Sequence, residues 1–167
     1  SFEQAQSYNL DEYVGINPTN EASYHYYMDQ HLFNHVDMKR ENIHVPKGNT
    51  ADLQAAAAQY DTMIEAAGGV DIQLLGIGVN GHIGFNEPGT PFALGTNVVE
   101  LTESTREANK IYFNSIDEVP THAITMGIQT IMNAKKVVLL ISGASKQEAM
   151  ERLRGGEVSE DFPASAL

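Results

Sequence analysis

The chain has 167 residues, of which 42% are hydrophobic, and a chain of this length can bury the core of one domain. It carries 22 acidic and 10 basic residues, a formal net charge of -12, so most of its surface would repel a nucleic-acid backbone. It contains no cysteine, which excludes disulfides and thiolate metal sites. We therefore expect one domain over residues 1–167 that does not bind nucleic acid, although a compact site could still bind a small anionic substrate.

Two amphipathic helices are predicted in the first half of the chain. The first covers residues 23–33, where large apolar and aromatic side chains share one face. The second covers residues 52–67, where apolar residues recur at helical spacing. Asp52 is placed to cap this second helix, and the pair Gly68 and Gly69 is placed to stop it.

Two strands are predicted next, at residues 70–77 and 136–142. Both are mostly apolar runs, which is typical of strands buried on both faces, and a helix over residues 145–154 follows the second one. Strands that alternate with helices predict an α/β fold, here a Rossmann-like three-layer sandwich with a largely parallel sheet. Ligands of such folds bind beyond the carboxyl ends of the strands, so we expect functional residues in the turns after Leu10, Ile77 and Ser142.

The turn after the strand at residues 70–77 reads Gly-Ile-Gly-Val-Asn-Gly, which formally matches a dinucleotide-binding fingerprint. That fingerprint requires a helix to begin at its last glycines. Here Gly84, Pro88 and Gly89 follow, and these residues disfavour a helix. A nicotinamide cofactor is therefore not expected.

The same loop places Asn80, His82 and Glu87 within eight residues. An isolated histidine in a surface turn is most often simply solvated. However, a histidine that transfers protons near neutral pH needs a carboxylate or an amide to fix its tautomer and orientation, and this loop supplies both. The spacing therefore favours an acid-base group at His82.

An acidic pair, Asp11 and Glu12, stands where the chain would leave the first strand. From this segment alone, a solvated turn or a helix cap is the preferred interpretation. The alternative is that Asp11 serves as a base beside a substrate carbon.

Several segments of the chain resemble the signature segments of glucosamine-6-phosphate deaminases. They are residues 9–15 (Asn-Leu-Asp-Glu-Tyr-Val-Gly), the helix start Ser23-Tyr24, residues 76–88, residues 123–127 and residues 143–146. Related sugar-phosphate lactonases share the Gly-His element but lack the Phe-Asn-Glu-Pro sequence found here at residues 85–88. The loop motif therefore favours the deaminases within this group of enzymes.

The resemblance implies conversion of glucosamine 6-phosphate and water to fructose 6-phosphate and ammonia, without a cofactor or a metal. It assigns the opening of the sugar ring to His82, oriented by Asn80 and Glu87. It assigns the transfer of a proton from C2 to C1 to Asp11. It also implies that Gly78, Gly81 and Lys146 bind the substrate, with Lys146 on the phosphate. The alternative for this lysine is an ordinary residue of a first helical turn, but its place after a strand and a glycine turn favours phosphate binding.

Three departures from the family pattern weaken parts of this interpretation. Position 80 is Asn where many members have Asp, so its side chain can orient His82 but cannot stabilise an imidazolium by charge. Ile111, with Lys110 beside it, occupies the place of a phosphate-binding Arg. The phosphate loop that begins the family and the family's last elements are not in the sequence, so we expect the sandwich to be incomplete at both termini.

Two other functions stay open: another hexose-phosphate isomerase or lactonase, or a non-catalytic sugar-phosphate-binding fragment. His31 and His35 lie one helical turn apart but have no obvious third ligand, so a metal site is not expected. The first residues do not resemble a signal peptide, and the longest apolar stretch, Val137 to Ile141, is too short to cross a bilayer. We expect a cytoplasmic protein without membrane contact, and a homo-oligomer is compatible with the sequence.

Overall fold

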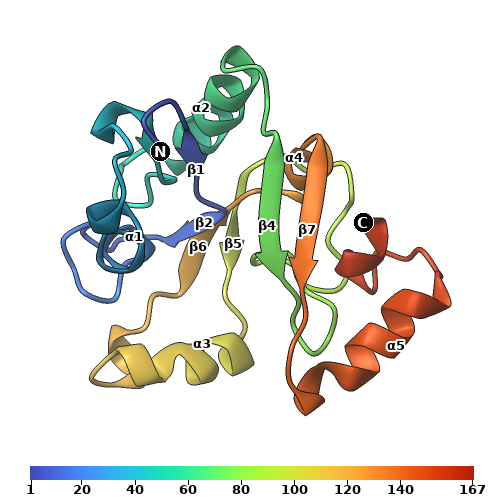
Figure 1. Ribbon diagram of the computed structural model, residues 1–167. Coiled ribbons are helices and arrows are strands. Elements are labelled where there is room, and N and C mark those ends of the chain that lie inside the picture. Colours follow the sequence, from blue (N-terminus) through green and yellow to red (C-terminus); the bar gives the residue numbers. More distant parts are fainter. The chain divides into compact units, whose positions relative to one another are not determined.

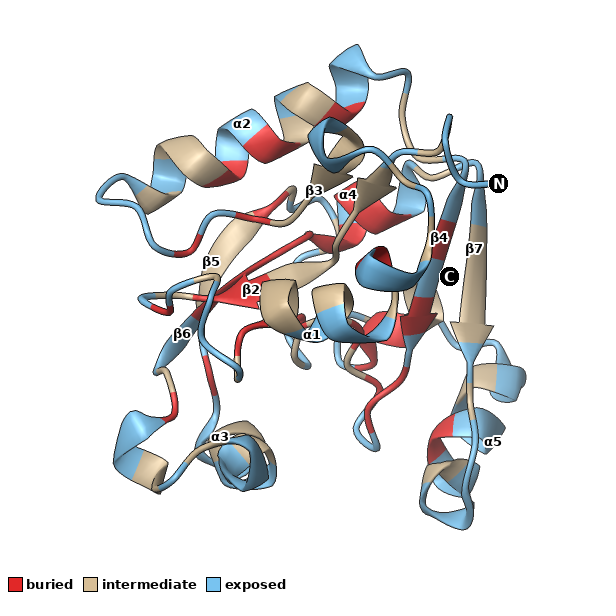
Figure 2. Ribbon diagram, turned by 60° about the vertical axis from the view of Figure 1, so that its left-hand side comes forward, coloured by how far each residue is buried: buried red, intermediate tan, exposed pale blue.

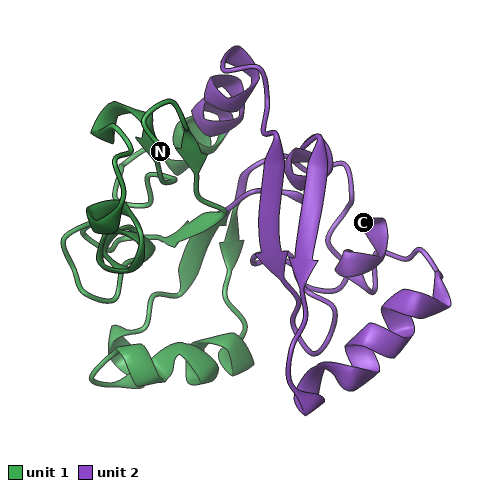
Figure 3. Ribbon diagram, viewed as in Figure 1, with its two compact units in different colours: residues 1–57, 98–124 green, residues 58–97, 125–167 purple.

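The computed structural model describes residues 1–167, which form two compact units (Figure 3). Unit 1 comprises Ser1–Ala57 and Val98–Ile124, and unit 2 comprises Ala58–Asn97 and Thr125–Leu167. Each unit therefore combines two segments that are far apart in the sequence. The expectation of a single domain over the whole chain stays a prediction.

Unit 1 carries two small sheets (Figure 1). In the first sheet, β1 (Ser7–Tyr8) pairs in parallel with β3 (Ile43–His44). The second sheet contains, in this order, β2 (Asp11–Tyr13), β6 (His122–Thr125) and β5 (Asn97–Glu100). The helices of this unit are α1 (Tyr24–His31), α3 (Glu103–Asn109) and the short 3-10 turns η1 (Phe33–His35), η2 (Arg40–Asn42), η3 (Lys110–Tyr112) and η4 (Ile116–Glu118).

Helix α1 begins where the sequence predicts, because Ser23 caps it. The Ser23 Oγ accepts the backbone N–H of Tyr26 at 3.0 Å, which satisfies one of the free donors of the first turn. The helix ends at His31, two residues before the predicted end, and the 3-10 turn η1 continues from there.

Helix α2 (Leu53–Ala66) also agrees with its predicted range. The Asp52 Oδ1 accepts the backbone N–H of Ala55 at 3.0 Å, as expected of an N-terminal cap. Gly68 and Gly69 follow with φ angles of 90° and 83°, a left-handed conformation that favours glycine and stops the helix.

Unit 2 is built on the parallel pair β4 (Ile72–Gly76) and β7 (Lys136–Leu140), in which Ile72 lies opposite Lys136 and Gly76 opposite Leu140. Its other elements are α4 (Ile128–Met132), the 3-10 turn η5 (Ala144–Lys146), α5 (Gln147–Gly155) and the 3-10 turn η6 (Pro163–Ala166). The predicted α/β class with parallel strand pairing is confirmed.

The prediction that these two strands are buried on both faces is wrong. Along β4, Gln73 and Leu75 are buried, whereas Ile72 is 62% exposed and Leu74 is 57% exposed. Alternate residues of a strand point to opposite faces, so one face of β4 is buried and the other is exposed, whereas Val137, Val138 and Leu139 of β7 are all half-buried. An unbroken apolar run does not distinguish a strand covered on two faces from one covered on a single face.

Each unit has its own apolar core, coloured red in Figure 2. The most deeply buried apolar side chains of unit 1 include those of Tyr13, Phe33, Val119, Ala123 and Ile124. Those of unit 2 include Ile83, Met126, Ile128, Ile131 and Phe162. None of the helices combines the length and the apolar character needed to cross a bilayer.

Candidate active site

The glycine-rich loop of unit 2 follows the carboxyl end of β4 and contains the predicted acid-base residues. It opens with a tight turn in which Gly81 donates its N–H to the Gly78 carbonyl at 3.0 Å and Gly78 donates to the His82 carbonyl at 2.8 Å. A Cβ on Gly78 would lie 2.1 Å from the His82 ring, so only glycine lets the imidazole rest against this turn. The glycine pattern therefore positions His82.

Asn80, His82 and Glu87 are brought together by this loop. The Asn80 Nδ2 donates to the Glu87 Oε2 at 2.9 Å, and the Asn80 Oδ1 accepts the backbone N–H of His82 at 3.1 Å. The same Oδ1 lies 2.7 Å from the His82 Nδ1, and the Nδ1 lies 3.7 Å from the Glu87 Oε2.

These contacts fix the tautomer of His82. Because the Asn80 amide nitrogen faces Glu87, its oxygen faces the imidazole and can only accept a hydrogen bond. The His82 Nδ1 therefore carries a proton, and in the neutral ring the Nε2 is the free base.

The surroundings of His82 also shift its acidity. Burial lowers the pKa of the His82 imidazole below its usual 6.5, the Glu87 carboxylate opposes this shift, and the Lys146 ammonium adds to it. The side chains of His82 and Glu87 are 32% and 24% exposed, so both can still be reached from solvent. The ring is thus kept neutral near pH 7, as a proton acceptor requires.

Lys146 lies in the turn after β7, the second turn predicted to be functional. Its Nζ donates to the Ile77 carbonyl at 2.6 Å, which brings the ammonium to the beginning of the glycine-rich loop. An ammonium has three N–H donors, so this bond leaves two of them for another acceptor.

Asn86 is a residue of the loop that sequence reasoning missed. It is fully buried, and its Nδ2 donates to the carbonyls of Ile83 and Met126, both at 2.9 Å. These bonds connect the loop to the segment after β6, where Gly127 has no room for a side chain because a Cβ would lie 2.1 Å from the Leu94 carbonyl oxygen. The resemblance included residues 85–88 and 123–127, but nothing in the sequence shows that these two segments touch.

Phe162 and its neighbours were missed as well. The Ala164 N–H donates to the Gly81 carbonyl at 2.9 Å, and a Cβ on Gly81 would lie 2.2 Å from the Phe162 ring. The Arg152 guanidinium covers this ring, 4.7 Å from its centroid. The segment at residues 159–166 therefore packs directly against the turn that carries His82.

Asp11, the predicted base, belongs to unit 1, where it is the first residue of β2. Part of its surface is exposed, but its carboxyl group is largely removed from water. This burial, together with the charge of the adjacent Glu12, raises the pKa of Asp11 to about 7. Glu12 itself is buried, a position that the sequence did not reveal.

The place of the family's phosphate-binding Arg lies in η3. Ile111 is 78% exposed, and the Lys110 Nζ lies 3.9 Å from the Glu107 Oε2, an exposed pair that contributes little to stability. Lys110 is therefore near the surface, where another anion could replace Glu107.

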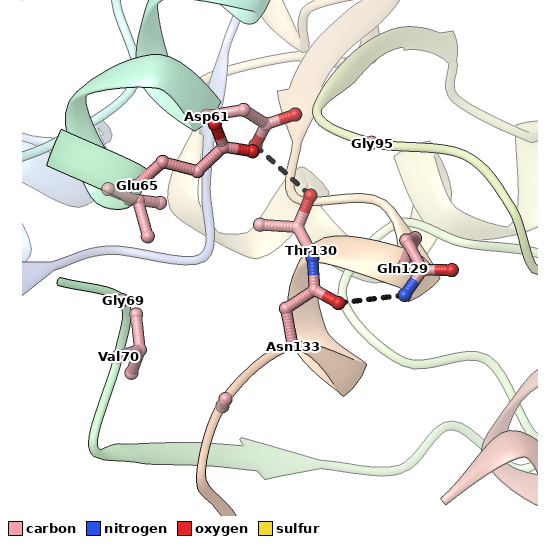
Figure 4. A pocket seen from close by; sticks show the side chains of 10 residues that line it. Asp61, Glu65, Gly69, Val70, Gly95, Gln129, Thr130 and Asn133 are labelled. Atoms are coloured by element: carbon pink, nitrogen blue, oxygen red, sulfur yellow. Dashed lines mark hydrogen bonds between the residues drawn. The ribbon is translucent and has the colours of Figure 1, made fainter.

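A separate cavity of about 220 Å³ lies at the amino ends of β4 and β7, the end opposite to the glycine-rich loop (Figure 4). Asp61 lines it, but its carboxylate accepts the Thr96 N–H at 2.8 Å, the Thr96 hydroxyl at 2.6 Å and the Thr130 hydroxyl at 3.0 Å. These bonds connect α2 to the segments before β5 and in α4. The carboxylate thus has a structural task, and the predicted site residues lie elsewhere.

Comparison with known proteins places the chain among sugar-phosphate enzymes. The family model described as glucosamine-6-phosphate isomerases/6-phosphogluconolactonase matches residues 2–167. A glucosamine-6-phosphate deaminase of Lysinibacillus sphaericus is 59% identical over 167 residues, which are 100% of this chain and 70% of the relative. Glucosamine-6-phosphate deaminase 1 of Bacillus subtilis is 54% identical over the same 167 residues, 69% of its length.

Solved structures agree with this result. A protein described as a monomeric glucosamine-6-phosphate deaminase superimposes with a TM-score of 0.97 at 54% identity, over 100% of this chain and 69% of that one. A 6-phosphogluconolactonase of Thermotoga maritima gives a TM-score of 0.76 at 16% identity, over 99% of this chain and 69% of that one. The second likeness shows a shared fold alone.

Proposed function

Because the chain belongs to the family of glucosamine-6-phosphate isomerases and 6-phosphogluconolactonases, we propose that it is a glucosamine-6-phosphate deaminase. The reaction converts glucosamine 6-phosphate and water to fructose 6-phosphate and ammonia. The observation that carries the choice within the family is the 59% identity to a deaminase over the full 167 residues, against 16% to a lactonase of the same fold.

His82 opens the sugar ring in this proposal. Its free Nε2 accepts the proton of the anomeric hydroxyl, the bond between C1 and the ring oxygen breaks, and the proton passes to that oxygen. The tautomer imposed by Asn80 supports this role, because it leaves the Nε2 and not the Nδ1 available to the sugar. Glu87 acts through Asn80, whose amide it holds in place.

Asp11 then transfers the proton between carbons. It removes the C2 proton of the open-chain aldehyde and returns a proton to C1, which gives a fructose imine that water hydrolyses to the ketose and ammonia. A base works best when its pKa is near the working pH, and a carboxyl group with a pKa of about 7 meets this condition. An ordinary exposed aspartate would be a weaker base by about three pKa units.

The remaining site residues are proposed to bind the substrate. Lys146 offers its two remaining N–H donors to the phosphate. Gly78 and Gly81 have no side chain, so the sugar can approach the turn closely, and their own N–H groups stay bonded within the loop or turn. A cytoplasmic location and a homo-oligomeric state stay predictions; a chain without cysteine fits a reducing compartment.

The proposal is tested by measuring ammonia and fructose 6-phosphate together after adding glucosamine 6-phosphate to the purified protein. Equal amounts of both products are expected. Hydrolysis of 6-phosphogluconolactone is measured in parallel and is expected to stay at the uncatalysed rate. Lactone hydrolysis without ammonia would support the lactonase alternative, and binding of glucosamine 6-phosphate without any product would support a binding module.

A further inference from the structure

The proposed proton transfers make no use of Glu12, although it is the next residue of β2 after the proposed base and is itself buried. Only 5% of the residue is exposed. Its Oε1 accepts the backbone N–H of Tyr13 at 2.9 Å and that of Tyr24 at 3.0 Å, and its Oε2 accepts the N–H of His25 at 3.0 Å. Burial of a carboxylate is unfavourable unless hydrogen bonds compensate it, and these three N–H groups supply that compensation.

The bonds of Glu12 suit a carboxylate that keeps its charge. All three partners are N–H donors, and two of them belong to the first turn of α1, where the helix dipole also favours an anion. The Oε1 already accepts two N–H groups, so a proton on that oxygen would displace one of them. Burial raises the pKa of Glu12 above its usual value, and the three backbone donors and the nearby His25 offset part of this rise.

Asp11, the adjacent residue, has the contrasting environment. Burial raises its pKa to about 7, the charge of Glu12 adds to this rise, and we expect Asp11 to take up a proton before Glu12 does. Asp11 and Glu12 thus have different roles, because their surroundings give the two carboxyl groups different pKa values.

We propose that Glu12 is a positioning residue that anchors β2 to the first turn of α1 and holds a fixed negative charge beside Asp11. This inference rests on the proposed function, because the charge matters only if Asp11 is the base. Other titratable groups surround the pair: Tyr13 on β2, Tyr24, His25 and Asp29 on α1, and Tyr112 on η3. The Tyr13 and Tyr24 rings stack at 4.9 Å with their hydroxyls 3.3 Å apart, and the His25 Nδ1 lies 3.5 Å from the Asp29 Oδ2.

The consequence is a specific pH dependence of the reaction. Asp11 must be ionised to accept the C2 proton, so kcat/KM falls at low pH as Asp11 becomes protonated. The negative charge of Glu12 favours the protonated form of Asp11 and therefore moves this acid limb to higher pH. Removal of the charge should move the limb to lower pH.

The test compares pH profiles of kcat/KM for ammonia release. Glu12→Gln keeps the size of the side chain but removes the charge, and we expect its acid limb to shift down by roughly half a unit to one unit of pH. Glu12→Asp keeps the charge and should leave the limb in place, even if it lowers the melting temperature. Glu41→Gln makes the same chemical change at an exposed position of unit 1 and should shift nothing.

An unshifted acid limb in a folded Glu12→Gln protein would show that Glu12 is only a helix anchor and would overturn the proposal. If Glu12→Gln does not fold, a carbon-13 NMR titration of the carboxyl groups in the unmodified protein decides. Asp11 is expected to take up its proton at higher pH than Glu12, and the reverse order would overturn the proposal. The titration does not depend on turnover, so a protein that releases no ammonia would contradict the proposed function without deciding the role of Glu12.

Discussion

Asp11 in unit 1 and His82 in unit 2 are both partly removed from water, and the consequences are opposite. Removal from water disfavours the charged form of either group. It therefore raises the pKa of the Asp11 carboxyl group and lowers the pKa of the His82 imidazolium. The pKa of Asp11 rises to about 7, and the pKa of His82 falls below 6.5. The comparison teaches that burial, the largest cause in both cases, moves the pKa of a carboxylic acid and that of an imidazole towards each other.

The supports of the two groups also differ. Asp11 is adjacent to a carboxylate held by three backbone N–H groups, whereas His82 is held by an amide that is itself held by Glu87. The charge of Glu12 changes the affinity of Asp11 for a proton. The amide of Asn80 determines which nitrogen of His82 carries the proton.

The largest effect is expected from Asp11→Asn. If Asp11 is the base at C2, the amide cannot accept the proton, and exchange of the C2 hydrogen should fall by roughly 10⁴-fold, the upper range for loss of an acid-base group. The measurement is deuterium incorporation at C2 from heavy water. Asp117→Asn, an exposed position of the same unit, is the control and should leave exchange unchanged. Normal exchange in Asp11→Asn would assign the base elsewhere.

A smaller loss, of a different kind, is expected from His82→Gln. Turnover of the cyclic amino sugar should slow by roughly 10²- to 10³-fold, because ring opening loses its general acid-base group. In the reverse direction, with fructose 6-phosphate and ammonia, exchange of the C1 hydrogen with solvent should persist, because this step does not involve the cyclic amino sugar. A loss confined to KM would contradict this division of tasks.

Stability should depend on pH in opposite senses for the two groups. The folded pKa of Asp11 is raised, so its contribution is fully present below the unfolded value near 3.8 and is lost as the pH rises to about 7. The folded pKa of His82 is lowered, so its contribution is present above 6.5 and is lost as the pH falls through the folded value.

Urea unfolding at several pH values tests this contrast. Asp11→Asn is expected to be more stable than the unmodified protein at pH 8, by roughly 1–2 kcal/mol, because no charge has to be buried. His82→Gln is expected to flatten the pH dependence of the unfolding free energy below pH 6.5. Equal stability of Asp11→Asn and the unmodified protein at pH 8 would mean that Asp11 is well solvated.

The smallest effect is expected from Glu87→Gln. The charge of Glu87 raises the pKa of His82, so its removal should lower that pKa further. Ring opening should slow only a few-fold, because Asn80 can still fix the tautomer. The pKa is read from an NMR titration of the imidazole, with Glu148→Gln on the exposed surface of unit 2 as the control. A pKa that rises or does not move would contradict the role given to Glu87.

Local features of the fold could be predicted from the sequence. The helix start at residues 23–24, the cap at Asp52 and the glycine stop after α2 each depend on residues within a few positions, and each appears as expected. The loop with Asn80, His82 and Glu87 was found for the same reason, since its hydrogen bonds span at most seven residues.

Features that depend on distant residues could not be predicted. Asn86 binds a carbonyl 40 residues away, and Glu12 binds the first turn of a helix 12 residues further on, so no local pattern marks either as buried. The exposure of Ile72 and Leu74 was missed because an apolar run carries no information about what covers it. The short strands β5 and β6 were missed because they lack a periodic signal over enough residues.

Because Phe162 packs against Gly81, the turn that carries His82 depends for its local stability on a segment about 80 residues later in the chain. Brief local opening of residues 159–166 would release the Gly81 carbonyl and the bond from the Gly89 N–H to the Glu160 carbonyl at the same time. Amide hydrogens in both segments should then exchange with the same free energy of opening and respond together to mild denaturant. On heating, enzymatic activity would therefore disappear at the temperature where this substructure opens, before the rest of the protein unfolds.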